Sequence, residues 1–263
     1  MFPWKGGMEM SVLEAKNLIK IYGGEEEWSA TKALNRISLK IEKGEFVGIM
    51  GPSGSGKTTL LNILSGIDKP TSGLVKISGF EISDLSKEAL ALFRRQHLGF
   101  VFQEFNLLDS LSLKENVMLP LVLDKKEADY MENKVKDVMS LFDIYDICNK
   151  YPYNVSGGQQ QRAAVSRAIV NEPDIVFADE PTGNLDSKSS KAIMKCFEKM
   201  NEEKEDTILV VTHDAFAASY CKKVIFIKDG MLHSEIVKKG SRKEFFDQIL
   251  DCLTVLGGDS DDL

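Results

Sequence analysis

The chain has 263 residues, of which 43% are hydrophobic, and a formal net charge of −7. This composition is sufficient for a large core, and the acidic balance disfavours a nucleic-acid scaffold, which needs a basic surface. No apolar run is long enough to span a membrane, and residues 1–10 lack the apolar stretch of a signal peptide. The cysteines have no zinc-like spacing, which predicts reduced thiols in a cytosolic protein; they are Cys148, Cys196, Cys221 and Cys252.

The N-terminal part of the chain is predicted to form a small sheet followed by a strand, a glycine-rich loop and a helix. Residues 11–22 and 33–41 mix apolar and polar positions, as half-exposed strands do. Residues 46–50 are continuously apolar, which is typical of a buried strand, and residues 58–64 favour a helix. Strands at 74–77 and 98–102 and a helix over 86–96 are expected to follow.

The middle of the chain changes character and is predicted to be a helical insertion between two halves of an α/β core. Helices are expected over residues 112–119 and 126–142, with Pro120 ending the first because proline lacks a backbone donor. In the second helix one face is apolar, which predicts core packing; it contains Met131, Val135, Val138, Met139 and Phe142.

The C-terminal half again alternates strands with helices, which predicts a mostly parallel, buried sheet. Asp229 and Gly230 indicate a hairpin turn. Residues 257–262 are predicted to be an acidic tail. The predicted strands are 174–178, 207–212, 223–228 and 231–237, and the predicted helices are 187–200, with Ile193, Phe197 and Met200 in register, and 242–250.

The glycine-rich loop matches the phosphate-binding pattern G-x-x-x-x-G-K-[ST]. Glycines allow the backbone N–H groups to surround phosphate oxygens, and the start of the following helix adds partial positive charge. Lys57 is expected to reach the β- and γ-phosphates, and Thr58 to offer its hydroxyl to Mg²⁺. The alternative, a plain turn with a surface lysine, does not explain the strand and helix on either side. The predicted nucleotide contacts here are Gly51, Pro52, Ser53, Gly54, Ser55, Gly56, Lys57, Thr58 and Thr59.

A second acidic element follows the apolar strand at 174–178. Asp179 stands at the carboxyl end of that strand, where a metal-directed carboxylate belongs, and Glu180 is placed to orient or deprotonate an attacking water. An ordinary strand end is the alternative, and the loop upstream disfavours it.

A third element assigns the family. Ser156 is a good N-cap, and Gly157 and Gly158 expose backbone N–H groups at a helix start, which makes a second anion site without its own lysine. Together with Gln159, the run 155–162 resembles the signature motif of ABC-type ATPases, with Val155 in place of the usual leucine. A glycine-rich helix cap with no phosphate role is the alternative.

Four further residues occupy positions that match other landmarks of this family. The resemblance implies that Gln103 is the Q-loop glutamine, a metal and γ-phosphate sensor, and that Asp186 is the D-loop aspartate. It also implies that His213 contacts the γ-phosphate and that Tyr22 stacks on adenine. A core or rim position is the alternative for Tyr22, since many strand-end aromatics are core or rim residues.

The resemblance covers residues 13–237 and implies an ABC ATPase fold. This fold has a P-loop core with a mostly parallel sheet, an N-terminal antiparallel β subdomain and a helical subdomain at about 105–170, followed by a C-terminal helix and tail over 238–263. Within the superfamily, some segments look like the lipoprotein-release and macrolide-export branch; they are 66–73, 99–103 and 178–186. Residues 211–221 and 224–230 are similar to bacitracin-type resistance transporters.

The resemblance implies an ATPase subunit that uses ATP and Mg²⁺ and drives a separate membrane permease from the cytoplasmic face of the membrane. We expect a head-to-tail homodimer with two ATP molecules between the copies, and no nucleic-acid partner. Phe105, Leu107 and Leu108 are candidates for a permease groove or, equally, for the core. A soluble ABC ATPase acting on nucleic acid or ribosomes is the main alternative, and a nucleotide-binding regulator is the third. The transported substrate stays open.

Overall fold

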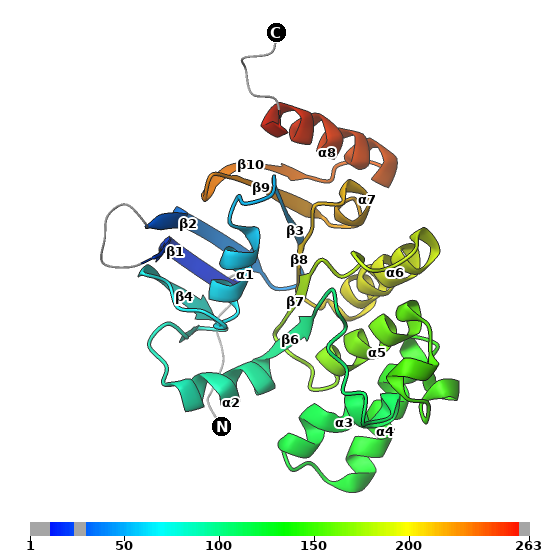
Figure 1. Cartoon of the computed structure of the whole chain (residues 1–263). Coiled ribbons are helices and arrows are strands. Elements are labelled where there is room, and N and C mark those ends of the chain that lie inside the picture. Colours follow the sequence, from blue (N-terminus) through cyan, green and yellow to red (C-terminus); the bar gives the residue numbers. More distant parts are fainter. Residues whose placement is uncertain (1–10, 24–29, 258–263) are drawn as a thin grey trace.

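The computed structural model describes residues 11–23 and 30–257, and these form two sheets with helices around them (Figure 1). The smaller sheet is four-stranded and antiparallel, in the order β2-β1-β4-β5. Its strands are β1 (Ser11–Tyr22), β2 (Thr31–Glu42), β4 (Ser72–Ile77) and β5 (Phe80–Glu81). The predicted antiparallel β subdomain is therefore confirmed.

The larger sheet has six strands in the order β10-β9-β3-β8-β7-β6. Its neighbours pair in parallel from β9 to β6, and β10 joins antiparallel through a hairpin. In that turn Asp229 and Gly230 have φ values of 51° and 71°, which confirms the predicted hairpin. The strands are β3 (Phe46–Met50), β6 (Leu98–Val101), β7 (Ile175–Asp179), β8 (Ile208–Val211), β9 (Lys223–Lys228) and β10 (Met231–Val237).

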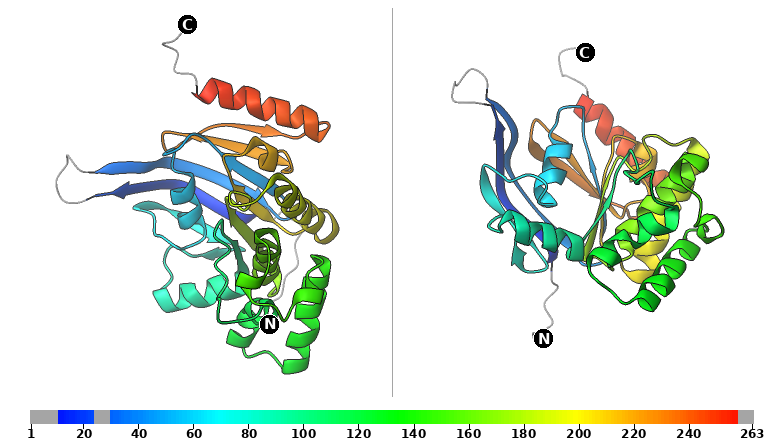
Figure 2. Two further views of the ribbon diagram at one scale, coloured as in Figure 1. Left: turned by 45° about the vertical axis from the view of Figure 1, so that its right-hand side comes forward. Right: turned by 60° about the horizontal axis from the view of Figure 1, so that its bottom comes forward.

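The helices separate into groups on the two faces of the larger sheet. One helix, α1, lies between the two sheets and contacts both, whereas α5 and α6 lie on the opposite face (Figures 1 and 2). α3 and α4 pack with α5 to one side and form the predicted helical insertion. The helices are α1 (Lys57–Leu64), α2 (Lys87–His97), α3 (Leu113–Leu123), α4 (Ala128–Leu141), α5 (Gly157–Ile169), α6 (Ser187–Lys204), α7 (Ala215–Ala218) and α8 (Arg242–Gly257).

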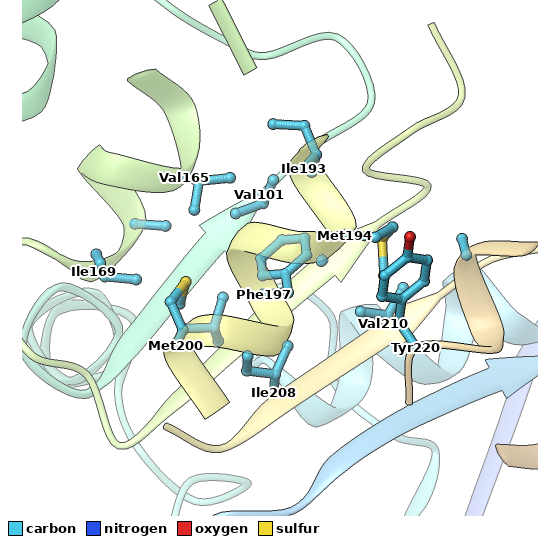
Figure 3. Packing of buried hydrophobic residues seen from close by; sticks show 14 of the residues in the cluster. Val101, Val165, Ile169, Ile193, Met194, Phe197, Met200, Ile208, Val210 and Tyr220 are labelled. Atoms are coloured by element: carbon cyan, nitrogen blue, oxygen red, sulfur yellow. The ribbon is translucent and has the colours of Figure 1, made fainter. Parts of the chain in front are cut away.

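The core consists of one apolar layer on each face of the larger sheet. Figure 3 shows the layer beneath α6, where Phe197 and Met200 lie near Ile208 of β8 and Ile193 lies near Val101 of β6. The three α6 residues are almost completely buried, so the predicted stripe is confirmed. The α4 stripe is confirmed as well, because Val135, Val138, Met139 and Phe142 are buried and Met131 packs against them. This packing fixes the carboxyl ends of the parallel strands, where the site residues lie.

Three predicted helix ends are wrong, and one of them is that of α6, which continues past residue 200 to Lys204 with Asn201 buried. Pro120 does not end its helix, because α3 continues to Leu123. A proline removes only one backbone donor, and the residue that follows it, Leu121, is fully buried, so packing outweighs the lost hydrogen bond. Near the C-terminus of the chain, α8 continues beyond residue 250 to Gly257, because Leu256 is buried on its last turn. The predicted acidic tail lies almost entirely outside the described residues.

The four cysteines are free thiols in the structure, as their spacing predicts. Across residues 11–23 and 30–257, no helix combines the length and the apolar character needed to cross a membrane.

Candidate active site

The glycine-rich loop joins β3 to α1 and is pressed against neighbouring backbone. A Cβ on Gly51 would lie 2.1 Å from the carbonyl oxygen of Ile227, and one on Gly56 would lie 2.5 Å from that of Ala33. Gly56 also adopts a left-handed φ of 98° at the N-cap of α1. Only glycine fits such positions. The sequence therefore builds a tight loop whose backbone ends at a helix N-terminus, a geometry suited to binding phosphate.

Lys57 closes this loop. Its Nζ donates hydrogen bonds to the carbonyl oxygens of Gly51 and Pro52, both at 2.9 Å. Burial lowers the pKa of Lys57, while the charges of Glu180 and Asp179 oppose that shift. The Lys57 ammonium is thus partly desolvated and has no carboxylate within ion-pair distance among the described residues. It is therefore already positioned to bind a phosphate.

Asp179 ends β7 as predicted, and its environment fits a metal ligand. Its Oδ1 is buried and has no hydrogen-bond partner among the described residues. Burial raises the pKa of Asp179, the charge of Glu180 raises it further, and Lys57 opposes both. A buried carboxylate oxygen without a partner is the hard donor that Mg²⁺ prefers. Asp179, Thr58 and Gln103 would hold the ion, which would supply positive charge to the phosphates.

Glu180 is held in place by the residues that follow β8. Its Oε1 accepts from the backbone N of His213 at 3.0 Å and lies 2.7 Å from His213 Nδ1, while its Oε2 accepts from Thr212 Oγ1 at 3.0 Å. Glu180 itself has a left-handed φ of 44°, a strained conformation common at functional sites. The structure therefore brings two predicted residues, Glu180 and His213, together. Sequence reasoning missed Thr212, whose only signal was its position directly after β8 and before His213.

Gln103 also lies beside a residue that sequence reasoning missed. Its Nε2 donates to Asn184 Oδ1 at 3.0 Å, and Asn184 Nδ2 donates to the Gln103 carbonyl oxygen at 3.2 Å. Asp186, two residues further on, is the N-cap of α6 and accepts from the backbone N of Lys188 and of Ser189. The Ser189 hydroxyl also donates to Asp186 Oδ2. This bond contributes most to lowering the pKa of Asp186, and the backbone bonds lower it further.

The predicted signature motif begins α5. Ser156 caps the helix in a reciprocal capping box with Gln159. A Cβ on Gly158 would lie 2.7 Å from Ser189 Oγ, so this glycine lets α6 approach closely. α5 packs against α3, α4, α6 and β6, whereas α1 packs against β1, β2, β7 and β8. Among the described residues, the signature helix and the helix that carries Lys57 therefore pack mainly against different elements.

Tyr22, at the end of β1, is 41% exposed and is fixed at its hydroxyl rather than packed in the core. The hydroxyl donates to Asp68 Oδ2 at 2.7 Å, and Lys20 Nζ lies 4.7 Å from the ring centroid. Burial raises the pKa of Tyr22, with Asp68 adding to the effect. The ring is therefore held in a defined orientation with exposed surface, and sequence reasoning missed both supporting residues, Lys20 and Asp68.

The three residues proposed from the sequence for a permease groove or the core lie in different environments. Leu107 packs against the core, Phe105 lies against Gly157, and Leu108 is exposed. A groove of about 320 Å³ lies between β6 and α3, and its lining includes basic residues. Its apolar lining is Leu98, Phe100, Phe102, Leu119, Pro120, Leu123 and Ala168, and its basic residues are Arg94, Arg95 and Arg167.

The fold and these motifs together define a P-loop ATPase cassette. The chain matches the ABC transporter family over residues 34–183. It is 50% identical to the bacitracin export ATP-binding protein BceA of Halalkalibacterium halodurans, over 96% of this chain and 100% of that protein. It is 54% identical to the ABC transporter ATP-binding protein YvcR of Bacillus subtilis, over 95% of this chain and 96% of that one.

A solved structure has the same fold. The ATP-binding cassette MJ0796 of Methanocaldococcus jannaschii, in a dimeric post-hydrolysis state bound to ADP and Pi, is 41% identical, with a TM-score of 0.78 over 87% of this chain and 100% of that one. The chain belongs to the ABC transporter family and is one of its ATP-binding, ATP-hydrolysing subunits.

Proposed function

We propose that the chain hydrolyses ATP as a head-to-tail homodimer. The observation that carries this proposal is the separation of two anion-binding elements: α1 with Lys57 and α5 with Ser156 have different neighbours in one chain. A second copy can bring its Ser156 to Gly158 onto the γ-phosphate held by the first copy's Gly51 to Thr58. The dimeric state of the related cassette from Methanocaldococcus jannaschii supports this arrangement.

Each residue around the phosphate has a separate proposed role. Lys57 and the loop N–H groups would bind the β- and γ-phosphates, and Thr58, Asp179 and Gln103 would hold Mg²⁺. Glu180 accepts the proton of the attacking water, and His213 orients Glu180 while contacting the γ-phosphate. Because Glu180 needs an ionised carboxylate, its bond to His213 Nδ1 requires a hydrogen on that nitrogen. Tyr22 stacks on adenine and Asp186 lies at the dimer contact.

The proposed partner is a membrane permease, which uses the energy of ATP hydrolysis for transport. The chain would bind this permease at the cytoplasmic face of the membrane. The groove between β6 and α3 would take an amphipathic helix of the permease, with Phe102 and Leu123 against its apolar face and Arg94 near its acidic residues. Hydrolysis would change the contacts of Gln103 with the phosphate and the cation. Because Gln103 directly follows Phe102, which lines the groove, this change would be transmitted to the bound permease helix. The similar proteins from Bacillus subtilis and Halalkalibacterium halodurans are ATP-binding components of transporters. This similarity supports a role in transport over a soluble ATPase acting on nucleic acid.

The transported substrate is proposed to be a peptide antibiotic of the bacitracin type. The support is the 50% identity to the bacitracin export protein over 96% of this chain and 100% of that protein. Macrolide export proteins are also similar, at 44% in Bdellovibrio bacteriovorus, but this chain covers only 31% of that protein. Deleting the gene in its native host should increase sensitivity to bacitracin more than to a macrolide. Unchanged bacitracin sensitivity would contradict the substrate proposal alone.

The ATPase proposal is tested with Lys57→Ala. Removing the ammonium should abolish productive nucleotide binding, measured by calorimetry with ATP and by phosphate release. Lys43→Ala, which changes a lysine on the turn between β2 and β3, is the matched control and should leave both unchanged. Near-normal turnover by Lys57→Ala would contradict the assignment of the loop.

A further inference from the structure

The Q-loop and the D-loop of one chain are joined by a reciprocal amide pair. Gln103 and Asn184 are 81 residues apart in the sequence, and their side chains and backbone make two hydrogen bonds, of 3.0 and 3.2 Å. One bond runs from Gln103 Nε2 to Asn184 Oδ1, and the other returns from Asn184 Nδ2 to the Gln103 carbonyl oxygen. Two such bonds between the same residues restrict the rotation of both amides.

The pair also determines which end of the Gln103 amide stays available. A backbone carbonyl can only accept, so Asn184 must present its Nδ2 to Gln103 O. Its Oδ1 then remains for Gln103 Nε2, which is the observed contact. With Nε2 engaged, Oε1 is the end of the Gln103 side chain left for a ligand, and an amide oxygen is a donor that Mg²⁺ accepts.

Gly183 provides the space for this arrangement. A Cβ on Gly183 would lie 2.9 Å from both Cδ and Nε2 of Gln103, so the amide of Gln103 lies directly over the Gly183 backbone. The Gly183 φ is not in the left-handed region, so alanine could adopt the backbone conformation. The glycine is therefore needed for the side chain of Gln103 and not for the turn itself.

A buried side chain braces the same two segments from the signature helix. Gln161 is fully buried, and its Nε2 donates to the carbonyl oxygens of Phe102 and Pro181. These two residues lie on the Q-loop side and the D-loop side of the amide pair. Gln161 thus fixes the spacing of the two segments from inside, while Asn184 and Gln103 pair at the surface.

We infer that Asn184 is a positioning residue, which holds the amide of Gln103 so that Oε1 faces the cation of the bound nucleotide. The inference rests on the proposed role of Gln103 as a metal ligand. Asn184 does not touch the cation itself; it acts through Gln103. Its contribution is preorganisation, because a glutamine side chain that is already oriented loses less conformational entropy when it binds.

The test measures cation affinity directly. Mn²⁺ replaces Mg²⁺ because it accepts the same oxygen ligands and is visible by electron paramagnetic resonance. Free Mn²⁺ is titrated against the full-length chain with a non-hydrolysable ATP analogue. Gln103→Ala should weaken Mn²⁺ binding about tenfold, and Asn184→Ala by a similar factor, as positioning partners of metal ligands do. The double variant should be no weaker than Gln103→Ala alone.

Gly183→Ala is the second variant, because it displaces the Gln103 amide without removing any polar group, and it should also weaken Mn²⁺ binding. Binding of the ATP analogue in EDTA is the control and should be unchanged in Asn184→Ala and Gly183→Ala, since the P-loop is intact. If Gln103→Ala weakens Mn²⁺ binding but Asn184→Ala does not, or if the two effects multiply in the double variant, the positioning role is wrong. If Gln103→Ala has no effect, the proposed ligand role of Gln103 fails as well.

Discussion

Nδ1 of His213 lies 2.7 Å from Oε1 of Glu180, and the backbone N of His213 donates to the same oxygen at 3.0 Å. The residue after β8 therefore fixes one carboxylate oxygen of the residue after β7. These strands are neighbours and parallel, so their carboxyl ends deliver both residues to one edge of the sheet. This arrangement fixes the orientation of the carboxylate that we propose as the base.

Glu180→Gln should bind ATP and hydrolyse it about 10²–10⁴-fold more slowly, because the amide cannot take a proton from water. Nucleotide affinity is measured by calorimetry, and single-turnover hydrolysis by phosphate release. Glu198→Gln, which changes a carboxylate on α6, is the control and should be normal. Wild-type turnover in Glu180→Gln would mean that the catalytic carboxylate lies elsewhere.

Thr212→Val should slow turnover with little change in ATP affinity. Valine keeps the shape but loses the hydrogen bond to Glu180 Oε2, and a misplaced reacting group can reduce the rate about 10²-fold. Thr212 Oγ1 also accepts from the backbone N of Asp214, so stability should fall by about 1–3 kcal/mol. Thr212→Ser retains both bonds and should restore turnover. Equal rates for the valine and serine variants would remove Thr212 from the mechanism.

Asp179→Asn should stabilise the nucleotide-free protein at neutral pH. Burial, assisted by the charge of Glu180, raises the pKa of Asp179 in the folded state. A carboxyl with a raised pKa contributes stability below its unfolded pKa of about 3.9, and this contribution is lost as the pH rises through the folded value. Asparagine avoids the loss because it does not ionise.

The gain in melting temperature for Asp179→Asn should therefore be a few degrees at pH 8, since about 1 kcal/mol corresponds to about 2–4 °C at this size. It should shrink as the pH is lowered toward about 4. Adding Mg²⁺ and ATP should raise the melting temperature of the wild type far more than that of the variant. A gain that is independent of pH would show that ionisation of Asp179 is not its cause.

Tyr22→Ala should weaken ATP binding by about 1–3 kcal/mol, the usual contribution of one stacked base. Binding of inorganic tripolyphosphate should be unchanged, because the P-loop is untouched. Tyr22→Phe keeps the ring but loses the hydrogen bond to Asp68, so it should fall between alanine and wild type. If the alanine variant binds both ligands as the wild type does, Tyr22 is not the base platform.

Much of the fold, and the positions of several candidate site residues, were predictable because they depend on local patterns. The P-loop, Asp179 and Glu180 each follow a continuous apolar strand, and α6 has a regular buried stripe. Other features depend on contacts between distant segments, which spacing does not encode. The burial of Leu121 carries α3 past Pro120, and the pairing of Gln103 with Asn184 depends on how β6 and the turn after β7 meet.

The central claim is that two copies complete the site, and the mass of Glu180→Gln in solution tests it most directly. Light scattering on a size-exclusion column is recorded with and without ATP. Ser156→Asp in the same background is the matched variant. Aspartate is an equally good N-cap for α5 but places a negative charge against the partner's γ-phosphate.

We expect Glu180→Gln to be a monomer alone and a dimer with ATP, and the added Ser156→Asp change to leave a monomer that still binds ATP. A dimer that forms equally well with Ser156→Asp, or a Glu180→Gln protein that binds ATP yet stays monomeric, would contradict the claim.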